Sequence, residues 1–149
     1  MILVFNAGSS SLKAKLFDKE LKELKSFKIE RIGAGGTKNH RQAAKEILAK
    51  LRGTDPRIIG HRVVHGGDKF FEPIEINNEV ITEIEKLSEL APLHNPPALE
   101  VIKTLLRQGF GGQALKQYAV FDTAFFRDLP KEAKYYPLPY EYYKKGIKK

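Results

Sequence analysis

The sequence predicts an α/β domain built around one mixed β-sheet, and three features support this fold class. Apolar and polar residues alternate with a period of two in the first third of the chain, as in half-exposed strands. Apolar residues recur at helical spacing in three later segments, and short apolar runs return between them. With 149 residues, 42% hydrophobic and 30% charged, the chain has the composition of one globular domain with its own core.

Three strands are expected in the first third of the chain. The apolar run at residues 2–5 ends at an Asn-Ala-Gly-Ser-Ser-Ser turn, and residues 12–17 and 24–32 alternate apolar with polar side chains. These segments predict a three-stranded antiparallel meander. The glycine-rich residues 33–36 follow as a loop.

Three helices are expected in the remainder. The first covers residues 40–52, with Asn39 as its N-cap and Gly53 after its end. Residues 79–90 and 97–107 carry apolar side chains three and four positions apart, which predicts two more amphipathic helices.

Two further strands are expected, one at residues 58–64 after the first helix and one at residues 117–122 after the last helix. The element order is β-β-β-α-β-α-β, which is that of a ribonuclease-H-like domain with a mixed sheet flanked by helices. The glycine-rich segment 107–113 interrupts a helix-to-strand connection, and we interpret it as a surface loop. A phosphate cradle is the alternative, although no helix with Lys-Ser/Thr follows as a P-loop requires.

Charge and residue usage limit the function classes. A net charge of +8 and a pI of about 9.6 favour anionic partners. The lack of cysteine excludes disulfides, thiolate zinc sites and cysteine nucleophiles, and it fits a reducing cytosol. No run reaches the roughly 18 apolar residues of a membrane-spanning helix, and the apolar N-terminus lacks the basic flank of a signal peptide. We therefore expect a cytoplasmic protein with no membrane partner.

The turn after the first strand is a candidate phosphate site. Gly8 lets the backbone approach a ligand closely, the hydroxyls of Ser9 and Ser11 add donors, and Lys13 supplies positive charge. Because the turn joins two strands, it can grip phosphates between them. A serine-rich hairpin turn without a ligand is the alternative.

A second cluster, His61–Gly67, closes a later strand. Arg62 and Val64 share one face of that strand, and the two histidines share the other. A guanidinium beside a small apolar wall suits a short carboxylic acid. A buried ion pair between Arg62 and a carboxylate of the protein is the alternative.

Two more candidates lie further along the chain. His94 and Asn95 are placed by prolines at the start of a helix, where the helix dipole favours an anion, and Asn95 as a plain N-cap is the alternative. Asp122 follows a buried strand, where α/β sheets place ligands, and is a candidate metal-linked carboxylate or general base. An N-cap of the following turn is the alternative for Asp122.

In this order, the motifs resemble those of the acetate kinase family. The matching segments are Asn6–Lys13, His61–Gly67, Leu90–Pro96, Phe121–Phe125 and Tyr136–Tyr140. That family belongs to the sugar kinase, Hsp70 and actin superfamily, so the resemblance implies an actin-like ATPase domain. It also implies reversible, Mg²⁺-dependent transfer of the γ-phosphoryl group of ATP to acetate, which gives acetyl phosphate and ADP.

The resemblance assigns roles on the nucleotide side of the reaction. It implies that Asn6 helps to hold Mg²⁺ and the phosphates. Ser9, Ser11 and Lys13 are implied contacts of the ATP phosphates.

The resemblance also assigns roles on the acceptor side. It implies that Arg62 binds the acetate carboxylate or the transferring phosphoryl group, and that Val64 and Leu93 line the pocket for the methyl group. His94 is implied to stabilise charge near the phosphoryl group. Asp122 is the family's essential acid, and we interpret it as positioning Mg²⁺ and the nucleophile, because acetate is already an oxyanion.

Two departures from the family pattern bear on activity. Phe126 stands where the family usually has His, and the chain ends at Lys149, before the family's Gly-Phe-His-Gly-x-Ser-His motif. We therefore expect residues 1–149 to be the N-terminal domain, without the C-terminal nucleotide-binding domain, and to be inactive alone. Propionate as the substrate stays open, and so does a homodimer, which in this family depends largely on the missing domain.

Two other functions are weighed against this one. The chain can be a non-catalytic phosphate- or carboxylate-binding domain that acts with a partner chain. A basic ribonuclease-H-like domain can also be a nuclease or a nucleic-acid binder, and a nuclease requires clustered carboxylates for two metals. Only Asp18 and Asp122 are obvious candidates for such a cluster, so we expect no nucleic-acid partner.

Overall fold

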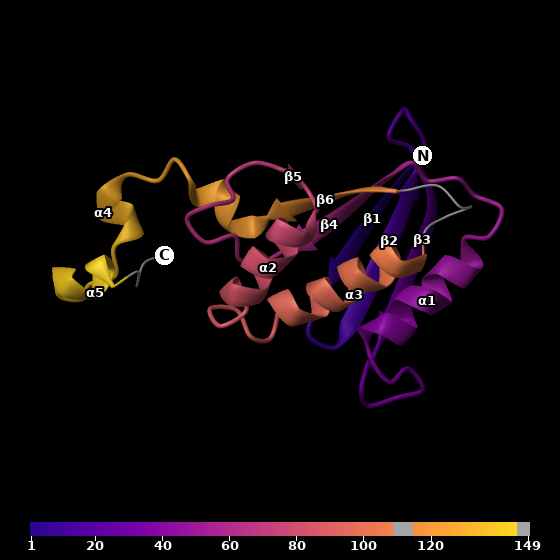
Figure 1. Ribbon diagram of the computed structural model, residues 1–149, viewed down its shortest axis with the longest axis horizontal. Helices are drawn as coiled ribbons and strands as arrows, with labels where there is room; N and C mark the ends of the chain where they lie inside the picture. Colours follow the sequence, from indigo (N-terminus) through magenta and orange to yellow (C-terminus); the bar gives the residue numbers. More distant parts are fainter. Residues whose placement is uncertain (109–114, 146–149) are drawn as a thin grey trace.

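The computed structural model describes residues 1–108 and 115–145 and contains a six-stranded mixed sheet with the strand order β3-β2-β1-β4-β6-β5 (Figure 1). The strands are β1 (Ile2–Ala7), β2 (Ser11–Phe17), β3 (Glu23–Glu30), β4 (Ile58–Val63), β5 (Ile74–Glu75) and β6 (Lys116–Phe121). The α/β class predicted from the sequence is confirmed. Most of the predicted glycine-rich loop, residues 109–113, lies outside the described residues.

Strand direction places three strand ends at one edge of the sheet. The pairs β1–β2 and β2–β3 are antiparallel, as the predicted meander requires. Strands β4 and β6 run parallel to β1, and the short β5 closes the sheet antiparallel to β6. The carboxyl ends of β1, β4 and β6 therefore lie side by side, at the edge where open α/β sheets bind ligands.

The three predicted helices are present with shifted bounds: α1 (His40–Lys50), α2 (Asn78–Leu87) and α3 (Asn95–Gln108). They lie on one face of the sheet (Figure 1), where α1 and α3 contact the strands and α2 packs beside α3. The Asn39 side chain caps α1 as predicted, by accepting a hydrogen bond from the Gln42 N–H. Asn77 caps α2 in the same way through the Val80 N–H.

The core lies between the sheet and these helices. Alternate residues of each long central strand point into it, for example Leu3 and Phe5 of β1 and Ile59 and Val63 of β4. The helices contribute apolar stripes at helical spacing: Ala43, Ala44, Ile47, Ala98, Val101, Ile102 and Leu105. The period of two in the strands and the helical spacing of the helices are thus both explained by one shared core.

The opposite face of the sheet is open. Val4, Ile58 and Val120 point to that face from β1, β4 and β6 and are 36%, 39% and 48% exposed. Among the described residues, no helix covers them. The candidate site described below opens at the end of this face.

Four short elements were not predicted: β5 and three helical turns in the last part of the chain, η1 (Asp122–Phe126), α4 (Lys131–Lys134) and α5 (Tyr140–Lys144). Each spans two to five residues, which is too short for hydrophobic periodicity to reveal. Helices α4 and α5 extend beyond one end of the sheet (Figure 1). Within the described residues, no helix is long and apolar enough to cross a membrane.

Candidate active site

Three polar side chains at the carboxyl ends of three neighbouring strands meet at one edge of the sheet. The Arg62 guanidinium donates from Nε to both carboxylate oxygens of Asp122, each at 3.0 Å, and from Nη2 to Asp122 Oδ2 at 2.6 Å. Its Nη1 donates to Asn6 Oδ1 at 3.0 Å. Asn6, Arg62 and Asp122 therefore form one hydrogen-bonded cluster, which we call the Arg62 cluster.

The strand register explains why these residues meet. Asn6 is the partner of Arg62 in the parallel β1–β4 ladder, and Arg62 is the partner of Val120 in the β4–β6 ladder. Asp122 lies two residues beyond Val120, where the strand period of two returns to the same face. The cluster thus lies on the open face, opposite the helices.

The cluster is accessible from solvent. The side chains of Arg62 and Asp122 are 46% and 38% exposed. The hydrogen bonds to Asp122 raise the pKa of the Arg62 guanidinium above its ordinary value, so this side chain keeps its charge at every working pH. An ion pair this exposed adds little to stability, so its geometry bears on ligand binding more than on folding. Arg62 already holds a carboxylate in its planar fork, the geometry in which a guanidinium binds carboxylates and phosphates.

The candidate phosphate turn lies next to this cluster. Lys13 of β2 pairs with Asn6 across the β1–β2 ladder. Its exposed side chain therefore lies beside Asn6, which accepts a hydrogen bond from Arg62. Ser9 is exposed and Ser11 is half-buried. The turn is closed by a 2.8 Å hydrogen bond from the Gly8 N–H to the Ser11 carbonyl.

A shallow hollow accompanies the turn on the open face. It has a volume of about 210 Å³ and is lined by Asn6 and Lys13 together with Val4, Lys15 and Phe17. Lys13 gives the hollow a positive charge at its mouth, whereas Lys15 is paired with Glu23 at 2.7 Å.

The segment after β4 is held by two side chains that its own sequence motif does not contain. Buried Asn95 accepts a hydrogen bond from the His65 N–H and donates one to the His65 carbonyl, both at 3.1 Å. The Gly66 N–H donates to Thr123 Oγ1 at 2.9 Å, which ties this segment to the residue after Asp122. The sequence predicts Asn95 at the start of a helix, either beside a bound anion or as a plain N-cap. Asn95 does begin α3, but its side chain is used to hold the backbone beside Val64.

His61 lies on the covered face, away from Arg62. Its Nε2 atom is 2.7 Å from Oε1 of Gln117 on β6, and both residues are buried. Burial lowers the pKa of His61 to about 4, and the hydrogen bond with Gln117 only partly opposes this effect. At neutral pH His61 is therefore an uncharged cross-strand partner inside the core.

Three predicted site residues are not joined to the cluster by a hydrogen bond in the described part of the chain. Leu93 and His94 are exposed in the loop before α3, and Leu93 is 67% exposed. Val64 is half-buried at the end of β4. Phe126, the departure from the family pattern, is exposed at the end of η1, where its ring meets the edge of Phe125.

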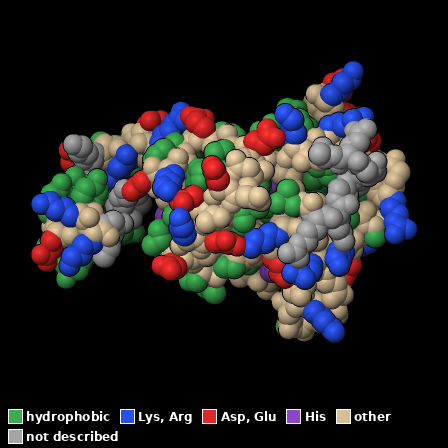
Figure 2. Space-filling model, viewed as in Figure 1, with side chains coloured by type: hydrophobic (Ala, Val, Ile, Leu, Met, Phe, Trp, Pro, Cys, Tyr) green, Lys and Arg blue, Asp and Glu red, His purple; other side chains and the backbone are tan. Residues whose placement is uncertain are grey.

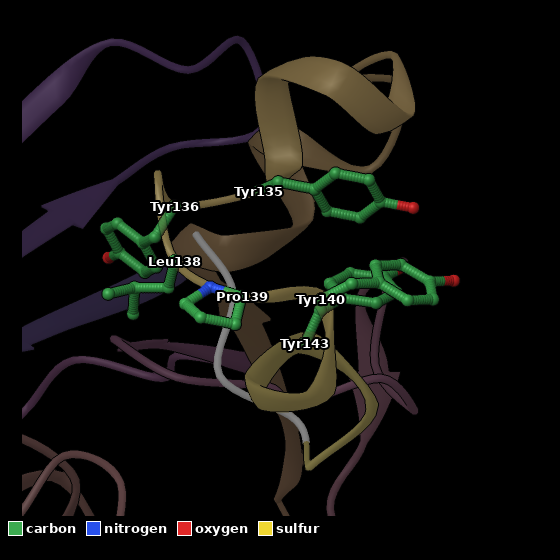
Figure 3. A pocket seen from close by; sticks show the side chains of 6 residues that line it. All are labelled: Tyr135, Tyr136, Leu138, Pro139, Tyr140 and Tyr143. Carbon is green, nitrogen blue, oxygen red and sulfur yellow. The ribbon is translucent and has the colours of Figure 1, made fainter.

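A separate pocket lies in the C-terminal segment. It holds about 130 Å³ between Tyr135, Tyr136, Leu138, Pro139, Tyr140 and Tyr143. Figure 3 shows the rings of Tyr135, Tyr140 and Tyr143 gathered on one side and Tyr136 with Leu138 on the other. Packing against these rings and the Tyr140 hydroxyl raise the pKa of Tyr135 to about 12. The pocket is lined by aromatic and apolar side chains and lacks the charged groups of the Arg62 cluster.

The two carboxylates considered for a nuclease lie apart. Asp18 follows β2 at the opposite edge of the sheet, because Phe17 pairs with Ile2 at the start of β1. Its Oδ1 atom accepts hydrogen bonds from the Glu20 and Lys22 N–H groups and so closes a turn. On the helical face, Lys and Arg side chains are interspersed with Asp and Glu (Figure 2). Among the described residues, no group of three His, Asp or Glu side chains is arranged to hold a metal ion.

Comparison with known families identifies the chain. The model of the acetokinase family matches residues 34–149. The chain belongs to the acetokinase family. The match confirms the resemblance read from the motifs, and with it the assignment of the chain to a family of carboxyl-acceptor phosphotransferases.

Curated acetate kinases cover nearly the whole chain. The acetate kinase of Sulfurovum sp. is 41% identical over 169 aligned residues, which include 97% of this chain and 42% of the relative. That of Bacillus velezensis is 43% identical, with 99% of this chain and 43% of the relative covered. The chain thus spans about two fifths of the length of the relatives it matches. Both alignments are longer than 149 residues, so the relatives contain residues in this region that the chain lacks.

Solved structures share the fold. The acetate kinase of Porphyromonas gingivalis matches 99% of this chain and 43% of its own, with a TM-score of 0.88 and 33% identity. A propionate kinase from Francisella tularensis matches 99% of this chain and 44% of its own, with a TM-score of 0.80 and 31% identity. The six-stranded sheet is therefore that of the N-terminal actin-like domain of these kinases.

Proposed function

We propose that this chain is the N-terminal, phosphate- and carboxylate-binding part of an acetate kinase. The reaction is the reversible, Mg²⁺-dependent transfer of the γ-phosphoryl group of ATP to acetate, which yields acetyl phosphate and ADP. The Arg62 cluster carries this proposal, because its guanidinium, amide oxygen and carboxylate lie next to the turn between β1 and β2 and to Lys13 of β2.

On the nucleotide side, the turn after β1 binds the phosphates of ATP. Lys13 supplies a point charge, and the hydroxyls of Ser9 and Ser11 donate hydrogen bonds to phosphate oxygens. Backbone N–H groups of the turn are further, uncharged hydrogen-bond donors to the phosphate oxygens. The adenosine pocket then comes from outside this chain, which covers about two fifths of its relatives.

The donor set of the Arg62 cluster fits Mg²⁺. Asn6 Oδ1 and the Asp122 carboxylate are hard oxygen ligands, and Mg²⁺ in phosphoryl-transfer sites takes one or two such ligands with phosphate oxygens and water. When bound, the ion supplies positive charge against the phosphate oxygens. Asn6 and Asp122 would hold it, although in this structure both side chains accept hydrogen bonds from Arg62.

On the acceptor side, Arg62 binds the acetate carboxylate or the phosphoryl oxygens through the fork that now holds Asp122. Val64 lies just beyond the end of β4, two residues after Arg62, and forms an apolar wall for the methyl group. Leu93 and His94, exposed before α3, are free to approach the methyl group and the phosphoryl group.

The chemistry requires alignment more than proton transfer. A carboxylate oxygen of acetate attacks the γ-phosphorus and forms the new P–O bond, while the bond to the β-γ bridging oxygen breaks and its electrons stay with ADP. Acetate carries no proton to remove, so we assign Asp122 to positioning rather than to base catalysis. Positive charge from Arg62 and Lys13 offsets the charge on the phosphoryl oxygens. Because ATP is a cytoplasmic substrate, we place the reaction in the cytoplasm.

Propionate kinase activity is the second candidate, because the chain is also similar to the Francisella tularensis propionate kinase. A non-catalytic domain that binds phosphate or carboxylate beside a partner chain is the third. The ratio of kcat/KM for acetate to that for propionate separates the first two, because one extra methylene must fit beside Val64.

A hydroxamate assay for acetyl phosphate tests the proposal in two forms of the protein. We expect the 149-residue chain alone to show little or no turnover with ATP, Mg²⁺ and acetate. Joined to the remaining segment of the Sulfurovum acetate kinase, it should turn over acetate. Turnover by the chain alone that is comparable to a full-length family enzyme would contradict the proposal. A folded, ATP-binding chimera without turnover would favour the non-catalytic domain.

A further inference from the structure

Buried His40 connects the first helix to the candidate phosphate turn. It opens α1, is 6% exposed, and places its Nε2 atom 2.7 Å from the Gly8 carbonyl oxygen. No family motif read from the sequence includes His40. We propose that His40 is a positioning residue of the phosphate turn: it anchors the Gly8–Ser9 peptide so that the Ser9 N–H points at the anion. The proposal rests on the phosphate-binding role proposed for this turn.

Peptide geometry links the anchored carbonyl to the outward N–H. The peptide bonds of the described residues are all trans, so the carbonyl of Gly8 and the N–H of Ser9 point in opposite directions from one planar group. The carbonyl points to His40, on the side of the sheet that α1 covers. The Ser9 N–H therefore points away from α1, toward the face from which Asn6 and Lys13 project.

The rest of the turn leaves this N–H available. The Gly8 N–H donates to the Ser11 carbonyl, and the Ser10 carbonyl accepts from the Ile32 N–H at 3.0 Å. Within the described residues, the Ser9 N–H donates to no protein group. A backbone N–H without a protein partner is able to donate a hydrogen bond to an anion.

Loss of the anchor would free the peptide to rotate. A Cβ atom on Gly8 would lie 2.9 Å from Ser11 Oγ, so the turn is tightly closed on that side. The Gly8 carbonyl, by contrast, is held by the His40 ring, 32 positions along the chain. The anchor requires a proton on Nε2, which is present both in one neutral tautomer and in the charged ring, so the device is not a pH switch.

The test measures tripolyphosphate binding by the 149-residue chain, with the Ser9 amide resonance as the local reporter. His40→Leu removes the donor but keeps an apolar filling, whereas His40→Gln restores an N–H near the position of Nε2. We expect about tenfold weaker binding and loss of the Ser9 response in His40→Leu, and rescue in His40→Gln. Asn39→Ala is the matched control, because it removes the cap of α1 without touching Gly8, and its affinity should equal that of the parent chain.

The outcomes separate this inference from the proposed function. If tripolyphosphate does not perturb Ser9 in the parent chain, the role of the turn and the inference both fail. If the parent chain responds and folded His40→Leu responds equally, only the inference fails. Should His40→Leu not fold, the imidazole ¹⁵N shifts of the parent chain decide, because a ring protonated only on Nδ1 cannot donate to Gly8 and overturns the proposal. A ring protonated on Nε2 together with a responding His40→Gln supports it.

Discussion

Arg62 and Asp122, which are 60 positions apart in the chain, form an ion pair between the end of β4 and the residue that follows β6. The guanidinium donates to both carboxylate oxygens and keeps Nη1 for Asn6. The group proposed to bind a substrate anion is thus occupied by a carboxylate of the protein itself. A ligand carboxylate or phosphate has to share Arg62 with Asp122 or displace it.

Asp122→Asn should therefore tighten the binding of inorganic phosphate to this chain. The amide keeps the size of the side chain but removes a negative charge from the anion site. Exposed ion pairs are worth about 0.2–1 kcal/mol, so we expect an affinity gain of up to about fivefold. Titration of the Arg62 Nε–H resonance with phosphate measures it.

Asp128→Asn is the control for that variant, because Asp128 pairs with Arg127 in an exposed ion pair away from the cluster. Its phosphate affinity should equal that of the parent chain. Weaker phosphate binding in Asp122→Asn would mean that Asp122 helps Arg62 to hold anions rather than competing for it.

Arg62→Ala should abolish most of the activity of the chimera with the Sulfurovum segment. Removing one group that stabilises charge in a transition state costs about 10²–10³ in kcat, and kcat/KM for acetate should fall with it. The kcat of Arg62→Lys should lie between that of the unchanged chimera and that of Arg62→Ala, because lysine keeps the positive charge but lacks the planar guanidinium that makes two parallel hydrogen bonds. Arg41→Ala, on the exposed side of α1, is the control. Unchanged kcat/KM for acetate in Arg62→Ala would exclude the proposed role.

His61 should make stability fall as the pH is lowered from 6.5 to 4. The pKa of His61 is about 4 in the folded chain, below its ordinary value of 6.5, so the unfolded chain binds the proton first. The contribution of neutral, buried His61 to the free energy of unfolding is fully present above pH 6.5. It is lost as the pH falls toward 4, by about 3 kcal/mol in all. Urea unfolding at pH 7 and pH 4.5 measures the difference.

Carboxylates titrate in the same range, so the comparison needs a variant without the buried histidine. The double variant His61→Leu, Gln117→Leu removes both polar partners and should show a smaller loss of stability over this interval. His94→Gln, which changes an exposed histidine, should keep the pH dependence of the parent chain. Equal slopes in the parent chain and the double variant would show that His61 does not contribute.

The elements that form the core were predictable because each carries its own periodicity. Strand alternation located β2 and β3, short apolar runs located β1, β4 and β6, and the helical stripes located the three long helices, each to within a few residues. Asn39 was recognisable as a cap because its hydrogen bond to Gln42 is local. In these cases the decisive contacts lie within a few residues of one another.

The contacts that assemble the site were not predictable in the same way. Arg62 and Asp122 were each placed at a strand end, but their pairing depends on the β4–β6 register, which no local pattern encodes. Asn95 matches an N-cap by residue type, yet its side chain holds the His65 backbone 30 residues away. His40 and Thr123 gave no signal, because their partners are backbone groups of distant turns.

Gly66→Ala should lower the free energy of unfolding, because Gly66 lies in the tightly packed segment that follows β4. A Cβ atom there would lie 2.8 Å from Phe121 Cγ and 2.9 Å from the Phe70 carbonyl oxygen, and the latter is backbone that cannot turn aside. The two phenylalanine rings are stacked with centroids 4.7 Å apart, so neither has room to withdraw. Overpacking of this kind costs about 1–3 kcal/mol, which urea unfolding should report as a lower midpoint. Gly36→Ala is the matched control, because nothing lies within 4 Å of its Cβ position. Equal midpoints for the two variants would show that the segment around Gly66 can move aside, and with it the hydrogen bond that ties Gly66 to Thr123.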